Sequence, residues 1–476
     1  MAQMDNTSLV QRFIKLPLIQ RQAFLEKLAS KGMSLANLPL PPCQDGVAPL
    51  PLSYAQQRQW FLWHLAPESS AYHVPSALHL RGELDLDALQ RALQRLAERH
   101  ESLRTRFDEQ HGAACQIIQP VSERPPQLHV QLLDSRPDAA ALEALIVSET
   151  ERLFDLREGP LWRVKLLTFG PQEHVLVLTL HHIVSDGASM QVLVDELVHL
   201  YLGERSGVTT DLARLPVQYA DYAIWQRQWM EAGERERQLA YWTTHLGSAP
   251  YLLELPTDRP RPPEQSYRGA RLDLPLSESL SERLRQLARQ QGVTMFMLLL
   301  ASFQTLLHRY SGQAQVRSGV PVANRNRPEI RGLIGFFVNT QVLKADFTDD
   351  LRFEQLLAQV KVDALAAQSY QDLAFEHLVE ALQPERDLSH HPLFQTMFNH
   401  QAQSQARALQ VDGLTVDPVA WNSVSVQFDL MLDTFETPEG LAASFKYATD
   451  LFDAATVERM AAHWQRLLGA IVADPA

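Results

Sequence analysis

The pattern of apolar and polar positions along the chain predicts short buried strands that alternate with long amphipathic helices. Runs rich in β-branched residues predict strands at 175–180, 316–322 and 424–429. Apolar residues that recur every three or four positions predict helices at 190–202, 295–308 and 353–369. This alternation predicts a mixed α/β fold.

Two stretches of the chain share one local pattern. In each, a predicted strand, 78–84 or 270–276, is followed by a capping residue, Asp85 or Ser277, and then by a helix with leucines along one face. A proline-rich connection at 255–263 separates the two stretches. A strand and helix repeated on either side of a stiff connector favour two related halves of about 200 residues each.

The start of the chain differs from the rest. It predicts a pair of amphipathic helices broken at Pro17, and the prolines of 38–52 then fix φ and remove backbone donors. We therefore divide the chain into a helical leader with its linker at 1–52, an N-terminal subdomain at 53–226 and a C-terminal subdomain at 227–476.

Composition excludes several classes of function. The 476 residues carry 43 Lys and Arg against 56 Asp and Glu, a net charge of −13, which does not favour nucleic acid as a partner. The two cysteines, Cys43 and Cys115, cannot form a disulfide framework, and their scarcity suits the cytoplasm. The most apolar run, 295–307, contains polar residues and is too short to span a membrane. Phosphate-loop, dinucleotide-binding and zinc-helix motifs are absent, so we expect neither nucleotide nor metal to be bound.

One group of residues points to chemistry. His181 and His182 end the predicted strand at 175–180, Asp186 and Gly187 form a turn, and Ser189 is the predicted cap of the next helix. Because successive strand residues face opposite sides, at most one of the two histidines faces a given cavity. A neutral imidazole accepts a proton or donates a hydrogen bond near neutral pH, which suits acyl transfer to an amine or hydroxyl. Asp186 is either an orienting carboxylate or a buried ion-pair member.

The H-H-x-x-x-D-G pattern of 181–187 resembles the core motif of condensation domains of nonribosomal peptide synthetases. Six further segments resemble motifs of that family in the same order. They are 53–62 (S-x-A-Q-x-R-x-W), 99–107 (R-H-E-x-L-R-T-x-F), 219–225 (Y-x-D-[FY]-A-x-W), 334–340 (I-G-x-F-V-N-T), 371–376 and 386–393. One departure is Ala188, where many relatives carry Trp.

The resemblance implies two chloramphenicol-acetyltransferase-like subdomains that form a V around a central tunnel. It implies amide bond formation between a donor aminoacyl or peptidyl thioester and the amine of an acceptor aminoacyl thioester. Both substrates would be tethered to phosphopantetheine arms of upstream and downstream carrier proteins, beside an adenylation domain, and the chain would bind no cofactor of its own. The leader would be a docking helix for an upstream subunit or a linker that follows a carrier protein.

The resemblance also assigns roles to residues. His182 would deprotonate or hydrogen-bond the attacking amine, and Gly187 would turn its backbone N–H toward the reacting thioester. His181 and Asp186 would support the site, with Arg104 the expected ion-pair partner of Asp186. Ser189 and Asn339 would line the tunnel or the subdomain interface.

Other members of the superfamily are alternatives. The intact histidine pair argues against a cyclisation domain, and the motifs at 338–340 and 386–389 argue against an epimerisation domain. The segment 72–85 and the 183–185 insert resemble domains that join an L-donor to an L-acceptor. A starter domain that takes a fatty acyl donor and a non-catalytic recruitment domain of the same fold remain as alternatives.

Overall fold

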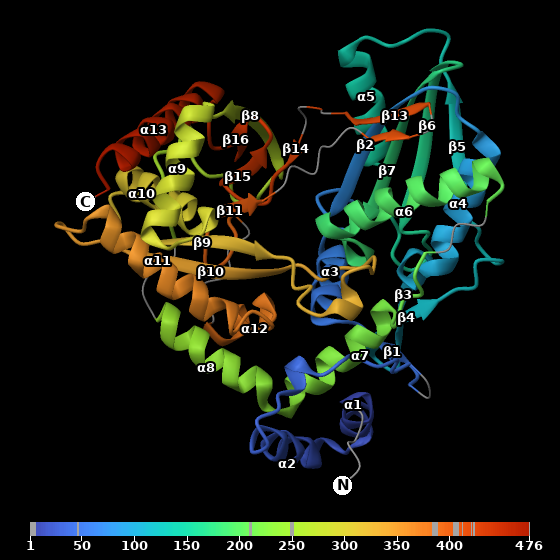
Figure 1. Cartoon of the computed structure of the whole chain (residues 1–476), viewed down its shortest axis with the longest axis horizontal. Helices are drawn as coiled ribbons and strands as arrows, with labels where there is room; N and C mark the ends of the chain where they lie inside the picture. The colour runs from blue at the N-terminus through green and yellow to red at the C-terminus, as the bar shows by residue number, and fades with distance from the viewer. Residues whose placement is uncertain are drawn as a thin grey trace. The chain divides into compact units, whose positions relative to one another are not determined.

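The computed structural model describes residues 6–44, 47–208, 212–247, 252–382, 389–402, 409–411, 413–419, 421 and 424–475. The chain divides into two compact units, and Figure 1 shows their elements. The first unit comprises Met1–Arg237, Ala323–Val338 and Ala406–Ala420, and the second comprises Gln238–Val322, Asn339–Gln405 and Trp421–Ala476. The predicted boundary between residues 226 and 227 falls inside a helix, and two later segments of the chain belong to the first unit.

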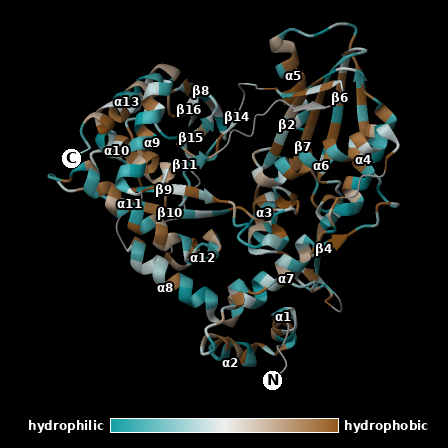
Figure 2. Cartoon of the chain, viewed as in Figure 1, coloured by the Kyte–Doolittle hydropathy of each residue, from teal (hydrophilic) through white to brown (hydrophobic). Residues whose placement is uncertain are grey.

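A six-stranded sheet forms the core of the first unit. Its strand order is β12(Leu409–Val411), β13(Leu414–Pro418), β2(His73–Arg81), β7(Glu173–His181), β6(Trp162–Gly170) and β5(Leu128–Leu132). Helices α4(Leu86–Arg99) and α6(Gly187–Ser206) pack together and bury their leucines against one face of this sheet, whose central strands are brown in Figure 2. Helix α5(Ala139–Thr150) contacts β2 and β7. Strand β7 is therefore buried along nearly its whole length, including its last residue, His181.

The first unit also contains a smaller sheet of order β1(Leu50–Pro51), β4(Ala113–Ile118) and β3(Thr105–Gln110). Its remaining helices are α1(Asn6–Lys15), α2(Leu18–Ala29), α3(Tyr54–Leu65) and α7(Tyr219–Trp229). A π-helical turn, Met230–Glu234, joins α7 to α8(Arg235–Leu246), in which the chain passes to the second unit.

The second unit contains a seven-stranded sheet. Its order is β10(Asn339–Asp346), β9(Gln315–Val322), β11(Thr396–Gln401), β15(Leu430–Thr437), β16(Gly440–Ala448), β8(Arg268–Pro275) and β14(Val424–Ser425). The helices of this unit are α9(Glu278–Gln291), α10(Met295–Ser311), α11(Phe353–Gln368), α12(Phe375–Leu382) and α13(Ala454–Ala473). Helix α10 lies in the middle of the apolar core, which explains its nearly continuous hydrophobic sequence.

The mixed α/β fold predicted from the sequence is confirmed, as are the two strand and helix repeats. Asp85 caps α4 and Ser277 caps α9, each by accepting a hydrogen bond from the backbone three residues later. The predicted strand at 424–429 is shorter than expected, because only Val424–Ser425 pairs with β8 before the chain turns into β15.

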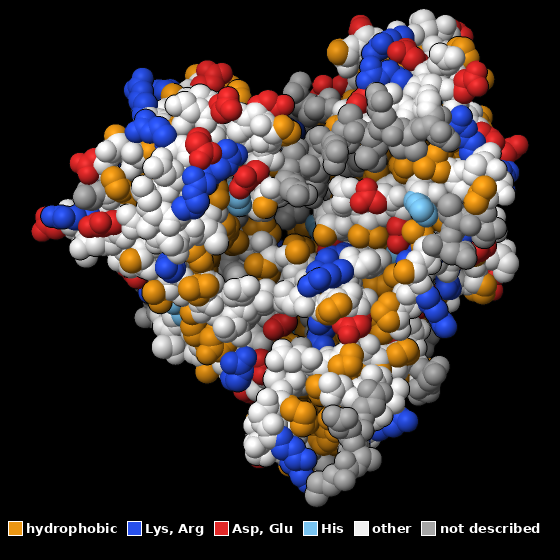
Figure 3. All heavy atoms as spheres, viewed as in Figure 1, with side chains coloured by type: hydrophobic (Ala, Val, Ile, Leu, Met, Phe, Trp, Pro, Cys, Tyr) orange, Lys and Arg blue, Asp and Glu red, His pale blue; other side chains and the backbone are white. Residues whose placement is uncertain are grey.

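The surface of the chain mixes charges of both signs, and the length and hydropathy of its helices bear on a membrane span. On the face shown in Figure 3, Lys and Arg side chains are scattered among Asp and Glu side chains. Within the described part of the chain, no single helix is long and apolar enough to cross a membrane, although α9 and α10, bent by 105° at their junction, reach that length and composition together.

Candidate functional site

The histidine pair lies where β7 gives way to a turn of 3-10 helix, His182–Val184, and then to α6. The backbone N–H of His182 donates to the carbonyl of Tyr72 at 2.8 Å, which ties the turn to the segment before β2. The cap of α6 is Asp186 rather than the predicted Ser189. Ser189 occupies the third helical position and donates its backbone N–H to the Asp186 carboxylate at 2.7 Å.

His181 is buried, with 3% of its surface exposed, and it supports the turn. Its Nδ1 accepts a hydrogen bond from the backbone N–H of Ile183 at 3.1 Å, so this nitrogen carries no proton. The rings of His73 and Phe154 lie 6.0 and 6.1 Å from its ring. Burial lowers the pKa of His181 well below its ordinary value, and the neighbouring His73 and His182 lower it further. His181 is therefore a neutral acceptor that shapes the turn.

The neutral state of His181 predicts acid sensitivity. A folded-state pKa below the unfolded value of about 6.5 means that the unfolded chain binds more protons, so stability falls as the pH drops below about 6.5. The free energy of unfolding should decrease by about 1.4 kcal/mol per pH unit for each such histidine. Urea unfolding at pH 7.5 and 5.5 measures this slope, which should be smaller in His181→Gln. An identical slope in the two proteins would contradict the prediction.

His182 is only partly buried, and its hydrogen bonds define its tautomer. Its Nδ1 lies 2.8 Å from the carbonyl oxygen of Ser185. Because a carbonyl can only accept, Nδ1 carries the proton, and the neutral ring has its lone pair on Nε2. In the described part of the chain Nε2 makes no hydrogen bond. Burial lowers the pKa of His182, against a raising effect of the Ser185 hydrogen bond and Asp186, so the ring is neutral near pH 7.

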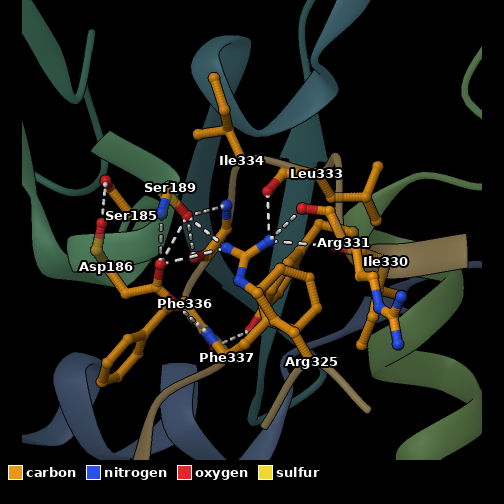
Figure 4. A network of polar contacts seen from close by, with 12 residues as sticks. Ser185, Asp186, Ser189, Arg325, Ile330, Arg331, Leu333, Ile334, Phe336 and Phe337 are labelled. Atoms are coloured by element: carbon orange, nitrogen blue, oxygen red, sulfur yellow. Dashed lines mark hydrogen bonds and ion pairs between the residues drawn. The ribbon is translucent and has the colours of Figure 1, made fainter. Parts of the chain in front are cut away.

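Asp186 is the centre of a buried polar network (Figure 4). The residue is 2% exposed, and its carboxylate accepts hydrogen bonds from four donors. These are the backbone N–H and hydroxyl of Ser189, the guanidinium of Arg325 at 3.1 Å and the backbone N–H of Phe337 at 3.0 Å. Asp186 thus fixes the start of α6 and a segment about 150 residues later in the chain.

The ion-pair partner of Asp186 is Arg325, and the prediction of Arg104 is wrong. Arg325 donates through Nη1 to the carbonyls of Ile330, Arg331 and Leu333, and its guanidinium lies 4.3 Å from the centre of the Phe337 ring. Arg104 instead donates to the carbonyl of Gln119 at 3.0 Å and lies 3.6 Å from the Glu101 carboxylate. Arg104 stabilises its own loop and has no contact with Asp186.

The backbone of Gly335 and Phe336 is hydrogen-bonded to the side chains of Ser189 and Tyr219. The hydroxyl of Ser189 accepts from the N–H of Gly335 at 3.0 Å and lies 2.7 Å from its carbonyl oxygen. The hydroxyl of Tyr219 donates to the carbonyl of Phe336, so the hydroxyl of Ser53, 2.8 Å away, donates to the Tyr219 oxygen. A Cβ at Gly335 would overlap the Tyr219 ring, so only glycine fits there.

Sequence reasoning did not assign a role to Arg325, Ser53, Tyr219 or Phe336. Ser53, Tyr219 and Phe336 lie within three of the segments matched to family motifs, so the motif matches contained a signal for them. Arg325 lies outside the matched segments, and only the folded chain brings it to Asp186.

Gly187 opens α6 with an exposed backbone, and a Cβ added at this position would meet no heavy atom within 4 Å. The first N–H groups of a helix have no acceptor in the preceding turn. Among the described residues none accepts from the Gly187 N–H. A hydrogen-bond donor therefore lies five residues after His182, the proton acceptor, at the same junction of strand and helix.

Comparison with known proteins decides the family. The family model of the condensation domain matches residues 48–476, nearly the whole chain. The chain belongs to the condensation domain family. It is 49% identical over 430 residues to one of the linear gramicidin synthase subunits of Brevibacillus parabrevis, covering 90% of this chain and 6% of that protein. It is 41% identical over 426 residues to malpibaldin synthetase of Mortierella alpina, covering 90% of this chain and 8% of that protein. The chain therefore spans less than a tenth of these relatives.

Solved structures agree with this assignment. The X-domain from teicoplanin biosynthesis is similar to this condensation domain with a TM-score of 0.83 and 28% identity, covering 91% of this chain and 97% of that one. The first condensation domain of the calcium-dependent antibiotic synthetase, solved with a substrate analogue, has a TM-score of 0.73 and 21% identity, covering 90% and 96%. The second likeness supports the fold alone.

Ser189 and Asn339, which were expected to line the tunnel or the subdomain interface, both make side-chain hydrogen bonds. Ser189 is fully buried in the Asp186 network, where its hydroxyl donates to the Asp186 carboxylate. Asn339 is the residue at which the chain returns to the second unit after the segment Ala323–Val338. Its side chain donates to the carbonyls of Gln371 and Leu373 and accepts from the N–H of Phe375. It thereby holds the motif at 371–376 onto β10.

The last family motif is only partly described. Arg386, Asp387 and Leu388 lie outside the described residues. The neighbouring histidines have separate partners, with His390 against the Ser389 hydroxyl, His391 against its neighbouring carbonyl and His400 against Thr434. Among the residues that the structure describes, no group of three or more His, Cys, Asp or Glu side chains could hold a metal ion.

Proposed function

We propose that this condensation domain catalyses amide bond formation between a donor aminoacyl or peptidyl thioester and the amine of an acceptor aminoacyl thioester. The observation that carries the proposal is the tautomer of His182, whose Nδ1–H is bound by Ser185 while Nε2 keeps its lone pair. A partly exposed, neutral imidazole nitrogen beside an unpaired helix N–H is suited to an acyl transfer in which an amine loses a proton.

The step uses each group once. The acceptor amine attacks the donor carbonyl carbon, the C–N bond forms, and Nε2 of His182 accepts or hydrogen-bonds the proton that the nitrogen gives up. The N–H of Gly187 donates to the oxyanion as negative charge develops on the carbonyl oxygen. The C–S bond then breaks and the leaving thiolate takes up a proton. Because a thioester is already activated, positioning of the two tethered reactants supplies much of the rate.

The partners follow from this chemistry. The substrates arrive on phosphopantetheine arms of an upstream donor and a downstream acceptor carrier protein, beside an adenylation domain, in the cytoplasm. The condensation domain itself needs no bound cofactor for this step. We further assign it to the type that joins an L-donor to an L-acceptor, from the pattern of residues 72–85 and the insert 183–185.

The test loads a donor and an acceptor carrier protein with aminoacyl groups and mixes them with the chain. Mass spectrometry should show the dipeptidyl group on the acceptor carrier and a free thiol on the donor carrier. Donors in the L and D forms and a fatty acyl donor distinguish the proposed type from a starter domain. Absence of product with all three donors would overturn the proposal.

A non-catalytic recruitment function is the second candidate, and one observation favours it. The X-domain from teicoplanin biosynthesis, whose structure is similar to this chain, has also been solved in complex with OxyB. The intact histidine pair and the free Nε2 of His182 support catalysis instead. Condensed product in the carrier assay excludes a purely recruiting role.

The lowered pKa of His182 predicts the acid limb of the reaction. The acceptor α-amine titrates near about 8, so the logarithm of the rate should fall with a slope of about one below that pH. Protonation of Nε2 at lower pH removes the base, so the slope of the logarithm of the rate should steepen to about two. Because the pKa of His182 is lowered, this second bend should lie below about pH 6.5. Single-turnover rates from pH 5 to 9 measure both bends. His182→Gln should lack the second, and its persistence in that variant would contradict the assignment.

A further inference from the structure

The network around Asp186 ends on a side chain that faces His182. The ring of Phe336 lies 4.6 Å from the ring of His182, tilted by 53°, and Phe336 is 5% exposed. Three backbone groups at and beside this residue have partners in the first unit. Ser189 holds Gly335, Tyr219 holds the Phe336 carbonyl, and Asp186 holds the Phe337 N–H at 3.0 Å. The backbone that carries the Phe336 ring therefore cannot move away from His182 without breaking this network.

We propose that Phe336 is a positioning residue for the condensation reaction, which packs at a tilt against the His182 imidazole and holds its ring plane so that Nε2 is presented to the acceptor amine. This inference rests on the proposed function. A single hydrogen bond, from Nδ1 to the Ser185 carbonyl, opposes rotation of the imidazole about its Cβ–Cγ bond. An aromatic ring packed against the imidazole adds steric resistance to that rotation, and it excludes water from the side that it contacts.

The contact between the Phe336 and His182 rings links Asp186 to the imidazole indirectly. Asp186 reaches the His182 ring through Phe337 and Phe336 rather than through a hydrogen bond to the imidazole. Tyr219 holds Phe336 independently of Asp186. Its hydroxyl donates to the Phe336 carbonyl, and its ring packs against Gly335. Two separate hydrogen bonds thus converge on one aromatic side chain.

Phe336→Ala should lower kcat in the carrier assay by about 10- to 100-fold, with KM for the loaded acceptor carrier changed by less than about threefold. Phe336→Leu, which keeps apolar cover, should recover part of kcat. Tyr219→Phe should lower kcat in the same direction by a smaller factor, because the Phe336 ring stays but its carbonyl is released. Wild-type kcat in both Phe336 variants would overturn the inference.

A second readout does not depend on product. Other groups that act on the His182 charge are the Ser185 carbonyl and Asp186, which raise its pKa, and Arg58, which lowers it. With these unchanged, loss of the apolar cover in Phe336→Ala should move the pKa of His182 upward, toward about 6.5. NMR titration of ¹⁵N-histidine-labelled protein, with His182→Gln to assign the signal, measures this shift.

The matched control is Phe13→Ala, which also removes a buried aromatic ring from the first unit. Phe13 lies in α1, is fully buried and packs against Phe24. This substitution should lower the melting temperature while leaving kcat and the His182 titration unchanged. If the wild-type chain forms no product but Phe336→Ala still shifts the His182 titration, the proposed function fails and the contact stands. If product forms and both Phe336 variants keep the wild-type kcat, the positioning role is refuted, whatever the titration shows.

Discussion

His182→Ala is expected to lower the rate of amide formation by about 10²- to 10⁴-fold without changing the melting temperature by more than a few degrees. The variant loses the proton acceptor that the turn offers before the start of α6, while the hydrogen bonds of His181 and Asp186 remain. Single-turnover assays with loaded carriers, read by mass spectrometry, measure the loss. Residual product should remain, because two tethered reactants still meet in an attack geometry.

His199→Ala is the matched control for this variant. His199 is an exposed histidine on the same helix, α6, and its removal should leave the rate at the wild-type value. His182→Gln separates two roles of the imidazole, since an amide can still donate or accept a hydrogen bond but cannot take up the proton near neutral pH. A rate for His182→Ala equal to that of the wild type would refute the catalytic assignment.

Local sequence patterns predicted the elements of the fold because their signals are local. Asp85 and Ser277 cap helices through atoms three residues away, and the buried strand β7 shows its character in six successive apolar or β-branched residues. The composition of the units could not be predicted this way. The segment Ala323–Val338 belongs to the first unit because of contacts with residues far back in the chain, for which the local pattern has no marker.

The candidate site shows the same limit. The histidine pair, Asp186 and Gly187 were found because they lie within seven residues of one another. The partner of Asp186 was assigned to Arg104 because that residue stands in a family motif, whereas the fold brings Arg325 to it across 139 positions. Ser189 was expected to line the tunnel or the subdomain interface, and nothing in the sequence indicated that its hydroxyl hydrogen-bonds to Asp186, Gly335 and Arg325. Which buried polar groups pair is decided by packing of the whole unit.

Removal of the Asp186 carboxylate is expected to produce the largest loss of stability. In Asp186→Ala the guanidinium of Arg325, whose side chain is 8% exposed, loses its counter-ion, and the start of α6 loses its cap. Breaking one side of a buried ion pair costs about 3–5 kcal/mol. For a unit of this size that lowers the melting temperature by about 6–20 °C, which differential scanning calorimetry would detect. Asp186→Asn should also destabilise, because its amide N–H₂ would face a donor, either the Phe337 N–H or the Ser189 and Arg325 group.

A double-mutant cycle separates the ion pair from the cap. Asp186→Ala combined with Arg325→Met removes both charges, so the pair of changes should cost less than the sum of the single changes. Arg91→Ala is the control for an exposed ion pair, because Arg91 is exposed and pairs with Glu204 on α6. It should lower the free energy of unfolding by at most about 1 kcal/mol. Because Asp186 holds the segment that carries Phe336, amide formation should fall together with the melting temperature. An Asp186→Asn variant that melts normally but has lost its activity would show instead that the carboxylate acts directly on the reacting groups.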